Sequence, residues 1–155
     1  MEGHMKVWLR GTVASYDSHS GELLWQFDPL QGQPHSGGAN VWAGITIDEA
    51  HQLVFLPTGA PSPDYYGGAR LGDNRHANSL VALDLLSGEV RWAFQHVHHD
   101  LWDFDSPAQP ILFEWPGEEE NIPAVLQLTK QGYLFLFNRL TGEPLWPVHE
   151  RPVPP

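Results

Sequence analysis

The stretch QHVHHDLWDFDSPAQP, from Gln95 to Pro110, is the part of the sequence richest in side chains that can do chemistry. Its sixteen positions hold three histidines, three carboxylates and a tryptophan: His96, His98, His99, Asp100, Asp103, Asp105 and Trp102. Imidazole and carboxylate groups at this density can bind a metal ion, supply a general base, or only bond the backbone of a polar turn. The scaffold that positions them decides between these three interpretations.

A metal site would draw on alternate residues of an extended segment, because alternate side chains of a strand face the same side. His96, His98 and Asp100 have this spacing, and histidine and aspartate are both zinc ligands. In a polar turn, Asp100 and Asp105 would instead organise the backbone around Trp102. The residues by themselves leave both interpretations open.

Three other segments share one pattern, which indicates the scaffold. An Asp or Asn precedes a glycine by four residues, Glu follows the glycine, and a tryptophan comes four residues after it. The three sets are Asp17, Gly21, Glu22 and Trp25; Asp84, Gly88, Glu89 and Trp92; and Asn138, Gly142, Glu143 and Trp146. A capping side chain followed by a glycine with positive φ predicts strand, tight turn and strand. Tryptophan at one register in all three favours docking between successive repeats.

The spacing of these repeats predicts the fold class. Trp25, Trp92 and Trp146 are 67 and 54 residues apart, which suits four-stranded propeller blades with long loops. Further strands are expected over 40–48, 52–59, 124–130 and 132–138, while 15 Gly and 14 Pro argue against long helices. We therefore expect an all-β partial β-propeller of four-stranded antiparallel blades with tryptophan-docking repeats. Residues 7–155 would hold about three blade equivalents, fewer than the ~4 to 8 that close a ring.

Composition excludes several classes of function. The formal net charge is -11, from 19 acidic and 8 basic side chains, which argues against nucleic acid as a partner. The absence of cysteine excludes thiol catalysis and Cys-ligated zinc. No apolar run approaches the ~20 residues that cross a bilayer, and the first residues lack the basic start and apolar core of a secretory signal peptide. Residues 1–6 are candidates for an expression tag or a leader.

Together with the tryptophan repeat, the stretches NVWAG, LPTGAPSPDYYGG and HHDLWDFDSPAQP resemble the pyrroloquinoline-quinone (PQQ) dehydrogenases, in particular the membrane-bound glucose dehydrogenase and its polyol and quinate relatives. The resemblance runs from about Val7 to Pro154 and covers a central slice of the family's catalytic domain. It implies an eight-bladed propeller with PQQ and a divalent cation, usually calcium, on its axis. It also implies a periplasmic location, a sugar or polyol substrate, and ubiquinone as the electron acceptor.

The resemblance assigns roles to individual residues. The family's general base, which also lies beside the metal ion, falls on Asp103. The basic residue that contacts the quinone oxygens falls on Lys130. Ser62 occupies the position where relatives present Asn or Thr toward the metal and the cofactor, and its hydroxyl is a weaker ligand than an amide oxygen.

Four neighbouring side chains receive supporting roles. The resemblance implies that His98 and His99 shape the loop that leads to Asp103 rather than bind a metal. Tyr65 and Tyr66, in a loop rich in Pro and Gly, either wall an access channel or cover the core.

Two functions compete on this basis. The first is that of a quinoprotein glucose or polyol dehydrogenase, which oxidises hydroxyl groups by hydride transfer to PQQ with Asp103 as the base. The chain is expected to be inactive in isolation, because the rest of the family's site comes from other blades. The second is a non-enzymatic, truncated propeller module that acts in binding or assembly. Either way, exposed apolar end faces, carrying residues like those of 53–57 and 133–138, predict a homo-oligomer.

Overall fold

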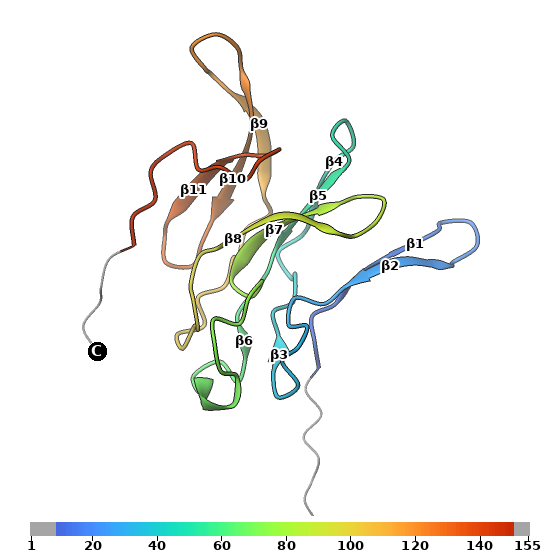
Figure 1. Ribbon diagram of the computed structural model, residues 1–155, viewed down its shortest axis with the longest axis vertical. Coiled ribbons are helices and arrows are strands. Elements are labelled where there is room, and N and C mark those ends of the chain that lie inside the picture. The colour runs from blue at the N-terminus through green and yellow to red at the C-terminus, as the bar shows by residue number, and fades with distance from the viewer. Residues whose placement is uncertain (1–8, 151–155) are drawn as a thin grey trace, which may run out of the picture.

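The computed structural model describes residues 9–150 and consists of antiparallel sheets (Figure 1). The first sheet pairs β1 (Val13–Tyr16) with β2 (Leu23–Phe27). The central sheet has the strand order β4-β5-β7-β8, and the last sheet has the order β11-β10-β9. The strand bounds of these two sheets are β4 (Thr46–Asp48), β5 (Leu53–Pro57), β7 (Ser79–Asp84), β8 (Val90–Gln95), β9 (Ile111–Trp115), β10 (Ile122–Leu128) and β11 (Leu134–Asn138). The all-β antiparallel class is confirmed.

A fourth, small sheet pairs β3 (Gly37–Gly38) with β6 (Pro61–Ser62). It lies at the lower end of the molecule in Figure 1, beside the short helix η1 (Gly67–Ala69). Within residues 9–150 no helix is long and apolar enough to span a bilayer. The proposed tag or leader over residues 1–6 lies outside the described residues.

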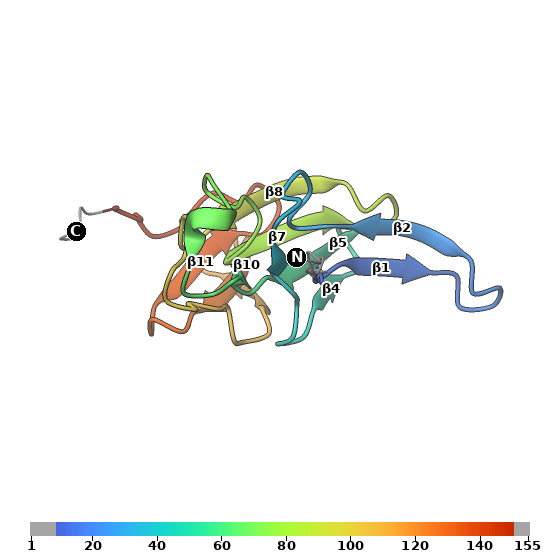
Figure 2. The same ribbon diagram turned by 90° about the horizontal axis from the view of Figure 1, so that it is seen from below.

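The middle strands of the central sheet, β5 and β7, are buried on both faces, because alternate residues point to opposite sides and a neighbouring sheet packs on each side. Toward the last sheet, side chains such as Phe55 and Leu80 pack against Val125 and Phe137. Toward the first sheet, a second set of central-sheet side chains packs against Phe27; this set is Val54, Leu56, Val81 and Leu83. Figures 1 and 2 show the resulting order, with the β1–β2 hairpin on one side of the central sheet and β9–β11 on the other.

The tryptophans join neighbouring sheets, as the repeat predicts. Trp25 Nε1 donates a hydrogen bond to Leu85 O at 3.0 Å, and its ring covers Gly88, where an added Cβ would lie 2.6 Å from the indole. The docking interpretation is therefore confirmed for Trp25. The indole occupies the space that only a glycine leaves free.

Trp92 repeats this contact one sheet further along. Its Nε1 donates to Arg139 O at 2.9 Å, and its ring covers Gly142, where an added Cβ would also lie 2.6 Å from the indole. Both glycines have positive φ, 72° at Gly88 and 76° at Gly142, as the turn pattern requires. Each tryptophan thus anchors the last strand of its own sheet to the turn of the next.

Two expected strands are shorter than the pattern predicts. Of residues 40–48, only Thr46–Asp48 forms a strand, because Asn40 O accepts a bond from Gly59 N and Gly44 turns the chain with a φ of 97°. The second strand of the third hairpin shrinks to a single bridge between Phe137 and Pro144. Proline has no N–H to continue a ladder, and a second proline follows at 147.

The expectation that residues like 53–57 lie on an open end face is wrong for that segment itself. All five residues of β5 are buried, because β5 is a middle strand of the central sheet. The outer faces belong instead to β1–β2 and to β9–β11. There, large apolar side chains are exposed, namely Tyr16, Leu23, Leu24, Ile111, Leu128 and Leu134.

Candidate functional site

The loop of residues 96–110 joins β8 to β9 and carries the candidate site. In Figure 1 it lies at the same end of the sheets as β3 and β6. Asp100 fixes its shape, since its buried carboxylate accepts backbone hydrogen bonds from Trp102 N at 2.8 Å and Phe104 N at 2.7 Å. Asn78 Nδ2 donates to the same carboxylate at 2.8 Å. The prediction that Asp100 organises the turn around Trp102 is confirmed.

Asp103 and Lys130 form an ion pair, with Lys130 Nζ 2.7 Å from Asp103 Oδ2. Their side chains are 29% and 45% exposed, so a small molecule can reach both. The hydrogen bond from Lys130 to Asp103 is the main cause that raises the pKa of Lys130. Asp103 itself has a φ of 59°, a left-handed conformation that is uncommon outside glycine and often found at functional sites.

The backbone at Asp105 ties Lys130 to the loop. Lys130 N donates to Asp105 O at 3.1 Å, and Lys130 Nζ lies 3.7 Å from Asp105 Oδ2. The turn that follows β10 is thereby held against the 96–110 loop. Two residues that are 27 positions apart in the sequence meet because the loop and the turn lie at the same end of adjacent sheets.

Asp105 has a different role from the one predicted. It does not bond the turn around Trp102; its Oδ1 accepts a hydrogen bond from Ala60 N at 2.7 Å. Gly59 makes room for this contact, since an added Cβ there would lie 2.6 Å from Asp105 Oδ1. Burial raises the pKa of Asp105, and the Ala60 N–H opposes this shift. In the sequence, only the position of Asp105 two residues after Asp103 indicates that it belongs to the site.

Ser62 lies on β6, in the segment that Asp105 holds through Ala60. Its Oγ is 3.2 Å from Asp64 Oδ1, and its carbonyl accepts a bond from Ser36 Oγ at 2.9 Å. Within the described residues its hydrogen bonds do not reach Asp103 or Lys130. The structure thus joins two of the three predicted site residues directly, and the ligand role of Ser62 stays a prediction.

Arg70 connects the Ser62 segment to the site loop and was not predicted. It is fully buried and donates to Pro63 O at 3.1 Å, Asp64 O at 3.2 Å and Asn74 Oδ1 at 2.7 Å, and also to Asp100 O. Burial lowers the pKa of Arg70, while the charges of Asp100 and Asp64 oppose the shift. A single guanidinium therefore fixes two loops relative to each other.

The zinc interpretation fails on its premise. Strand β8 ends at Gln95, so His96, His98 and Asp100 do not alternate along a strand. The His96 ring lies 4.7 Å from that of Phe135, and burial lowers its pKa to about 4. In the part of the chain that the structure describes, no three His, Cys, Asp or Glu side chains are grouped to hold a metal ion.

The other two histidines hold the start of the loop. His99 Nδ1 lies 2.7 Å from Gly72 O, and His99 N donates to Asp73 O at 3.2 Å. His98 Nδ1 lies 2.9 Å from Gln95 Oε1. These contacts agree with a role in shaping the loop.

Tyr65 and Tyr66 do not cover the core, since they are 74% and 65% exposed. Tyr65 lies close enough to Lys130 to contribute to the raised pKa of that lysine. The access-channel role of the two tyrosines stays a prediction.

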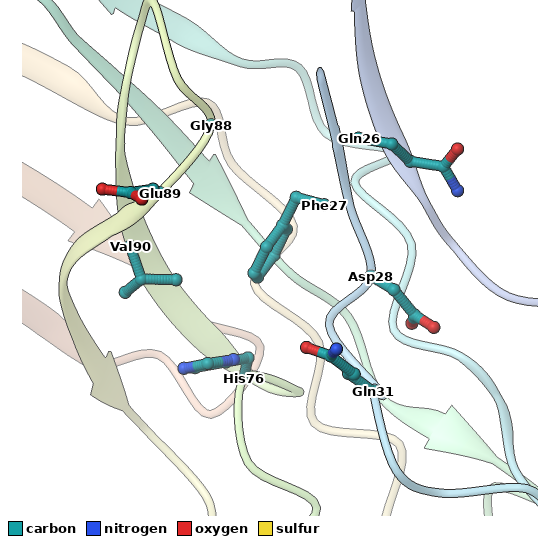
Figure 3. Close-up of a pocket in the computed structure, with 8 residues that line it drawn as sticks. All are labelled: Gln26, Phe27, Asp28, Gln31, His76, Gly88, Glu89 and Val90. Carbon is teal, nitrogen blue, oxygen red and sulfur yellow. The ribbon is translucent and has the colours of Figure 1, made fainter.

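A separate, open pocket of about 430 Å³ lies between β2 and the start of β8 (Figure 3). Phe27 and His76 form one wall, with their ring centroids 5.6 Å apart, and Gln26 points away from it. Neither Asp103 nor Lys130 lines this pocket. We base the candidate site on the ion pair rather than on this hollow, because the titratable side chains that line the hollow, Asp28, His76 and Glu89, form no hydrogen bond or ion pair with one another.

The Asp103–Lys130 pair makes a testable prediction for titration. In Asp103→Asn the pKa of Lys130 should fall back toward its ordinary value, because the main cause of its increase is gone. The pair's contribution to stability is present below the ordinary lysine pKa and is lost as the pH rises through the higher pKa of the folded state. NMR titration of the lysine side chains measures this directly, since the sequence has only two, Lys6 and Lys130. Asp73→Asn is the control, and an equal Lys130 pKa in wild type and Asp103→Asn would contradict the pairing.

Comparison with known proteins gives one family. Residues 2–155 match the PQQ family described as the glucose/ethanol/alcohol dehydrogenase β-propeller domain. The glycerol dehydrogenase large subunit of Gluconobacter oxydans is 37% identical over 99% of this chain and 22% of its own length. The quinoprotein glucose dehydrogenase of Escherichia coli is 37% identical over 93% of this chain and 20% of its own length. The chain thus spans about a fifth of the length of these relatives.

Solved structures agree with this comparison. The quinohemoprotein alcohol dehydrogenase of Comamonas testosteroni superposes with a TM-score of 0.79 and 26% identity, over 93% of this chain and 25% of that one. A quinohemoprotein alcohol dehydrogenase of Pseudomonas putida HK5 gives a TM-score of 0.80 and 25% identity, over 90% of this chain and 24% of that one. The expected β-propeller class is confirmed.

Proposed function

The chain belongs to the glucose/ethanol/alcohol dehydrogenase β-propeller family of quinoproteins, and from this premise we propose that it supplies one side of a PQQ-dependent active site. The observation that supports the proposal is the accessible ion pair between Asp103 and Lys130, at 2.7 Å. The substrate we propose is a sugar or polyol, whose hydroxyl group loses a proton and whose carbon loses a hydride.

Asp103 is the proposed general base. Its Oδ2 is fixed by Lys130, while its Oδ1 accepts no hydrogen bond from another described residue and is free to take the substrate's hydroxyl proton. A base must lie within hydrogen-bond reach of the proton it removes, and the 29% exposure of the carboxylate permits that approach. PQQ, when bound, supplies the hydride acceptor.

Lys130 is the proposed contact for the quinone. An ammonium group has three N–H donors, and in this structure one of them goes to Asp103. The remaining donors can bind a quinone oxygen while the ammonium group holds the Asp103 carboxylate in place. A neutral side chain at this position would lose both effects.

The described residues fit a bound cation only in part. Asp103 and Ser62 offer oxygen ligands of the type that calcium prefers, but calcium takes about 6 to 8 oxygens. Asp105 Oδ1 is already used by Ala60 N. We propose that Asp103 and Ser62 contribute to a calcium site whose other ligands come from elsewhere in the complete propeller. We further propose a periplasmic location and ubiquinone as the acceptor of the electrons.

A graft into a full-length relative tests this function. Residues 9–150 would replace the corresponding segment of the E. coli quinoprotein glucose dehydrogenase, and dye reduction with glucose, PQQ and calcium would be measured. Asp103→Asn in the graft should lower kcat by about 10²-fold or more, the usual contribution of a general base. The 155-residue chain assayed alone should show no turnover, because it offers one side of the site only.

Glu118→Asn, on an exposed loop, is the matched control in the same graft. An active graft that keeps its kcat in Asp103→Asn would overturn the proposed base. Turnover by the isolated chain that disappears in Asp103→Asn would instead show that the described residues suffice.

The second candidate function is a non-enzymatic module for binding or assembly, including a homo-oligomer formed through exposed blade faces. The observation that favours it is the exposure of apolar side chains on both outer sheets, for example Leu24 at 58% and Ile111 at 50%. If such side chains form a contiguous patch, that patch marks an interaction site.

A further inference from the structure

Two polar side chains, His96 and Gln127, lie between the central and last sheets, behind the 96–110 loop. His96 directly follows β8, and its ring centroid is 4.7 Å from that of Phe135 on β11. Gln127 on β10 is the register partner of Phe135, and side chains of opposed residues lie on the same face of a sheet. Phe135 packs into the core between the two sheets. His96 and Gln127 therefore meet beside the same phenylalanine.

Both side chains also contact one short segment of the 96–110 loop. His96 Nδ1 lies 3.3 Å from Ser106 Oγ, and Gln127 Nε2 donates to Ala108 O at 2.9 Å. Ser106 and Gln127 are buried. The polar region that these residues share is thus enclosed by the central sheet, the last sheet and the loop that joins them.

The hydrogen bonds of the two side chains fix which atoms face this region. His96 Nδ1 lies 3.1 Å from Asn78 O, and a carbonyl can only accept, so Nδ1 carries the proton and Nε2 presents a lone pair. Gln127 Nε2 donates to Leu128 O as well as to Ala108 O. Turning the amide over would set its oxygen against these two carbonyls. His96 Nε2 and Gln127 Oε1 are therefore both acceptors.

Neither acceptor receives a hydrogen bond from residues 9–150, although both atoms are buried. Burial lowers the pKa of His96 to about 4, so the ring is neutral at pH 7 and keeps the Nε2 lone pair. Thr129 Oγ1, two residues after Gln127, is likewise buried and unpaired in the described part of the chain. A buried acceptor without a donor is costly, and native proteins supply one from the protein or from ordered water.

We propose that this region is an internal binding site for a water molecule, which donates one hydrogen bond to His96 Nε2 and one to Gln127 Oε1. Water fits because one molecule has two donors and can also accept from Thr129 Oγ1, which makes the roughly three bonds typical of buried water. An anion does not fit, because His96 and Gln127 both present acceptors. The site links the end of β8 to β10, and it does not depend on the chemistry proposed at Asp103.

NMR spectroscopy of the 155-residue chain at pH 7 tests the proposal. The side-chain amide protons of Gln127 should show cross-relaxation with water, with opposite signs in NOESY and ROESY spectra. A long-lived bound water gives this pattern, whereas proton exchange gives the same sign in both. Nitrogen-15 spectra should show the Nδ1–H form of His96. A wild-type chain without these water signals, or with the Nε2–H form, overturns the proposal.

His96→Phe shows whether the water seen at Gln127 is the one that His96 holds. The variant keeps an aromatic ring beside Phe135 but has no acceptor, so the water signals at Gln127 should disappear. Gln109→Met is the matched control, because Gln109 Nε2 also donates to a backbone carbonyl, Ile45 O at 2.8 Å, while its side chain is exposed. The control should keep the signals. Signals that persist in His96→Phe overturn the shared site.

Urea denaturation gives a second measurement. His96→Phe and Gln127→Met should each lower the urea midpoint, and the double variant should lower it by less than the sum, because both side chains bind the same water. Additive shifts contradict the site, as do single variants with a raised midpoint, which is the result expected for two acceptors that are buried dry. If a variant does not fold, the wild-type spectra still decide the question.

Discussion

Trp92→Ala is expected to lower the free energy of unfolding by about 3–5 kcal/mol, the range for removing a large aromatic side chain from a core. Trp92 packs against Phe55 and Phe137, with ring centroids 5.9 and 5.8 Å away, in the cluster between the central and last sheets. It also supplies the hydrogen bond to Arg139 O at 2.9 Å. The substitution therefore leaves a cavity and also removes the hydrogen bond that holds Trp92 on the turn of the last sheet.

Urea denaturation followed by circular dichroism measures this loss, at one fixed protein concentration because association also shifts apparent stability. Trp92→Phe separates the two contributions, since it keeps most of the packing and should lose only about 1 kcal/mol for the Nε1 bond. Trp102→Ala is the matched control and should stay within about 0.5 kcal/mol of wild type. Equal losses for Trp92→Ala and Trp102→Ala would show that Trp92 does not hold the two sheets together.

Arg70→Met is expected to cost about 3–5 kcal/mol, because it removes the cation from a buried network. The three carbonyls of Pro63, Asp64 and Asp100 would each lose a donor, and the buried carboxylate of Asp100 would lose its compensating charge. Methionine has a similar length, so the effect reports lost hydrogen bonds more than lost volume.

Thermal unfolding followed by circular dichroism measures this second loss, and a fall in Tm on the order of 10 °C is expected for a chain of this size. Arg75→Met is the control, because Arg75 is exposed and belongs to the same segment of the chain. Since Arg70 holds the backbone of Asp100, the variant should also disorder the loop that presents Asp103, which NMR signals of that loop would show. An Arg70→Met protein as stable as Arg75→Met would contradict the role of the network.

Local sequence patterns were sufficient for the hairpin turns. The side-chain oxygen of Asp17, Asp84 or Asn138 accepts a bond from the backbone two residues later, to His19 N, Leu86 N and Leu140 N. The glycine then takes the positive φ that closes each turn. All the partners lie within five residues, so the sequence specifies them without any help from the rest of the molecule. Most strands were also predicted at the right positions, from the apolar residues within each segment.

The geometry of the candidate site depended on the tertiary fold more than the hairpin turns did. Asp103 and Lys130 were assigned to one site only through a resemblance to a family, and their ion pair was not predicted, because nothing local links residues 27 positions apart. The contact of Asp105 with Ala60 N, at 2.7 Å, joins residues 45 apart and was missed for the same reason. The zinc interpretation assumed that the strand continued past Gln95, and the strand ends there.

The sequence by itself thus determined the all-β class, the turn chemistry and the repeat of tryptophans, since each depends on residues close together in the chain. Only the tertiary structure decided which faces are covered, so that β5 is buried between two sheets while Tyr16 and Leu24 of the first sheet are exposed. It also decided which loops meet at the site. The physical reason is that burial and long-range hydrogen bonds are properties of stacked sheets, and the order of the stack is not contained in any one strand.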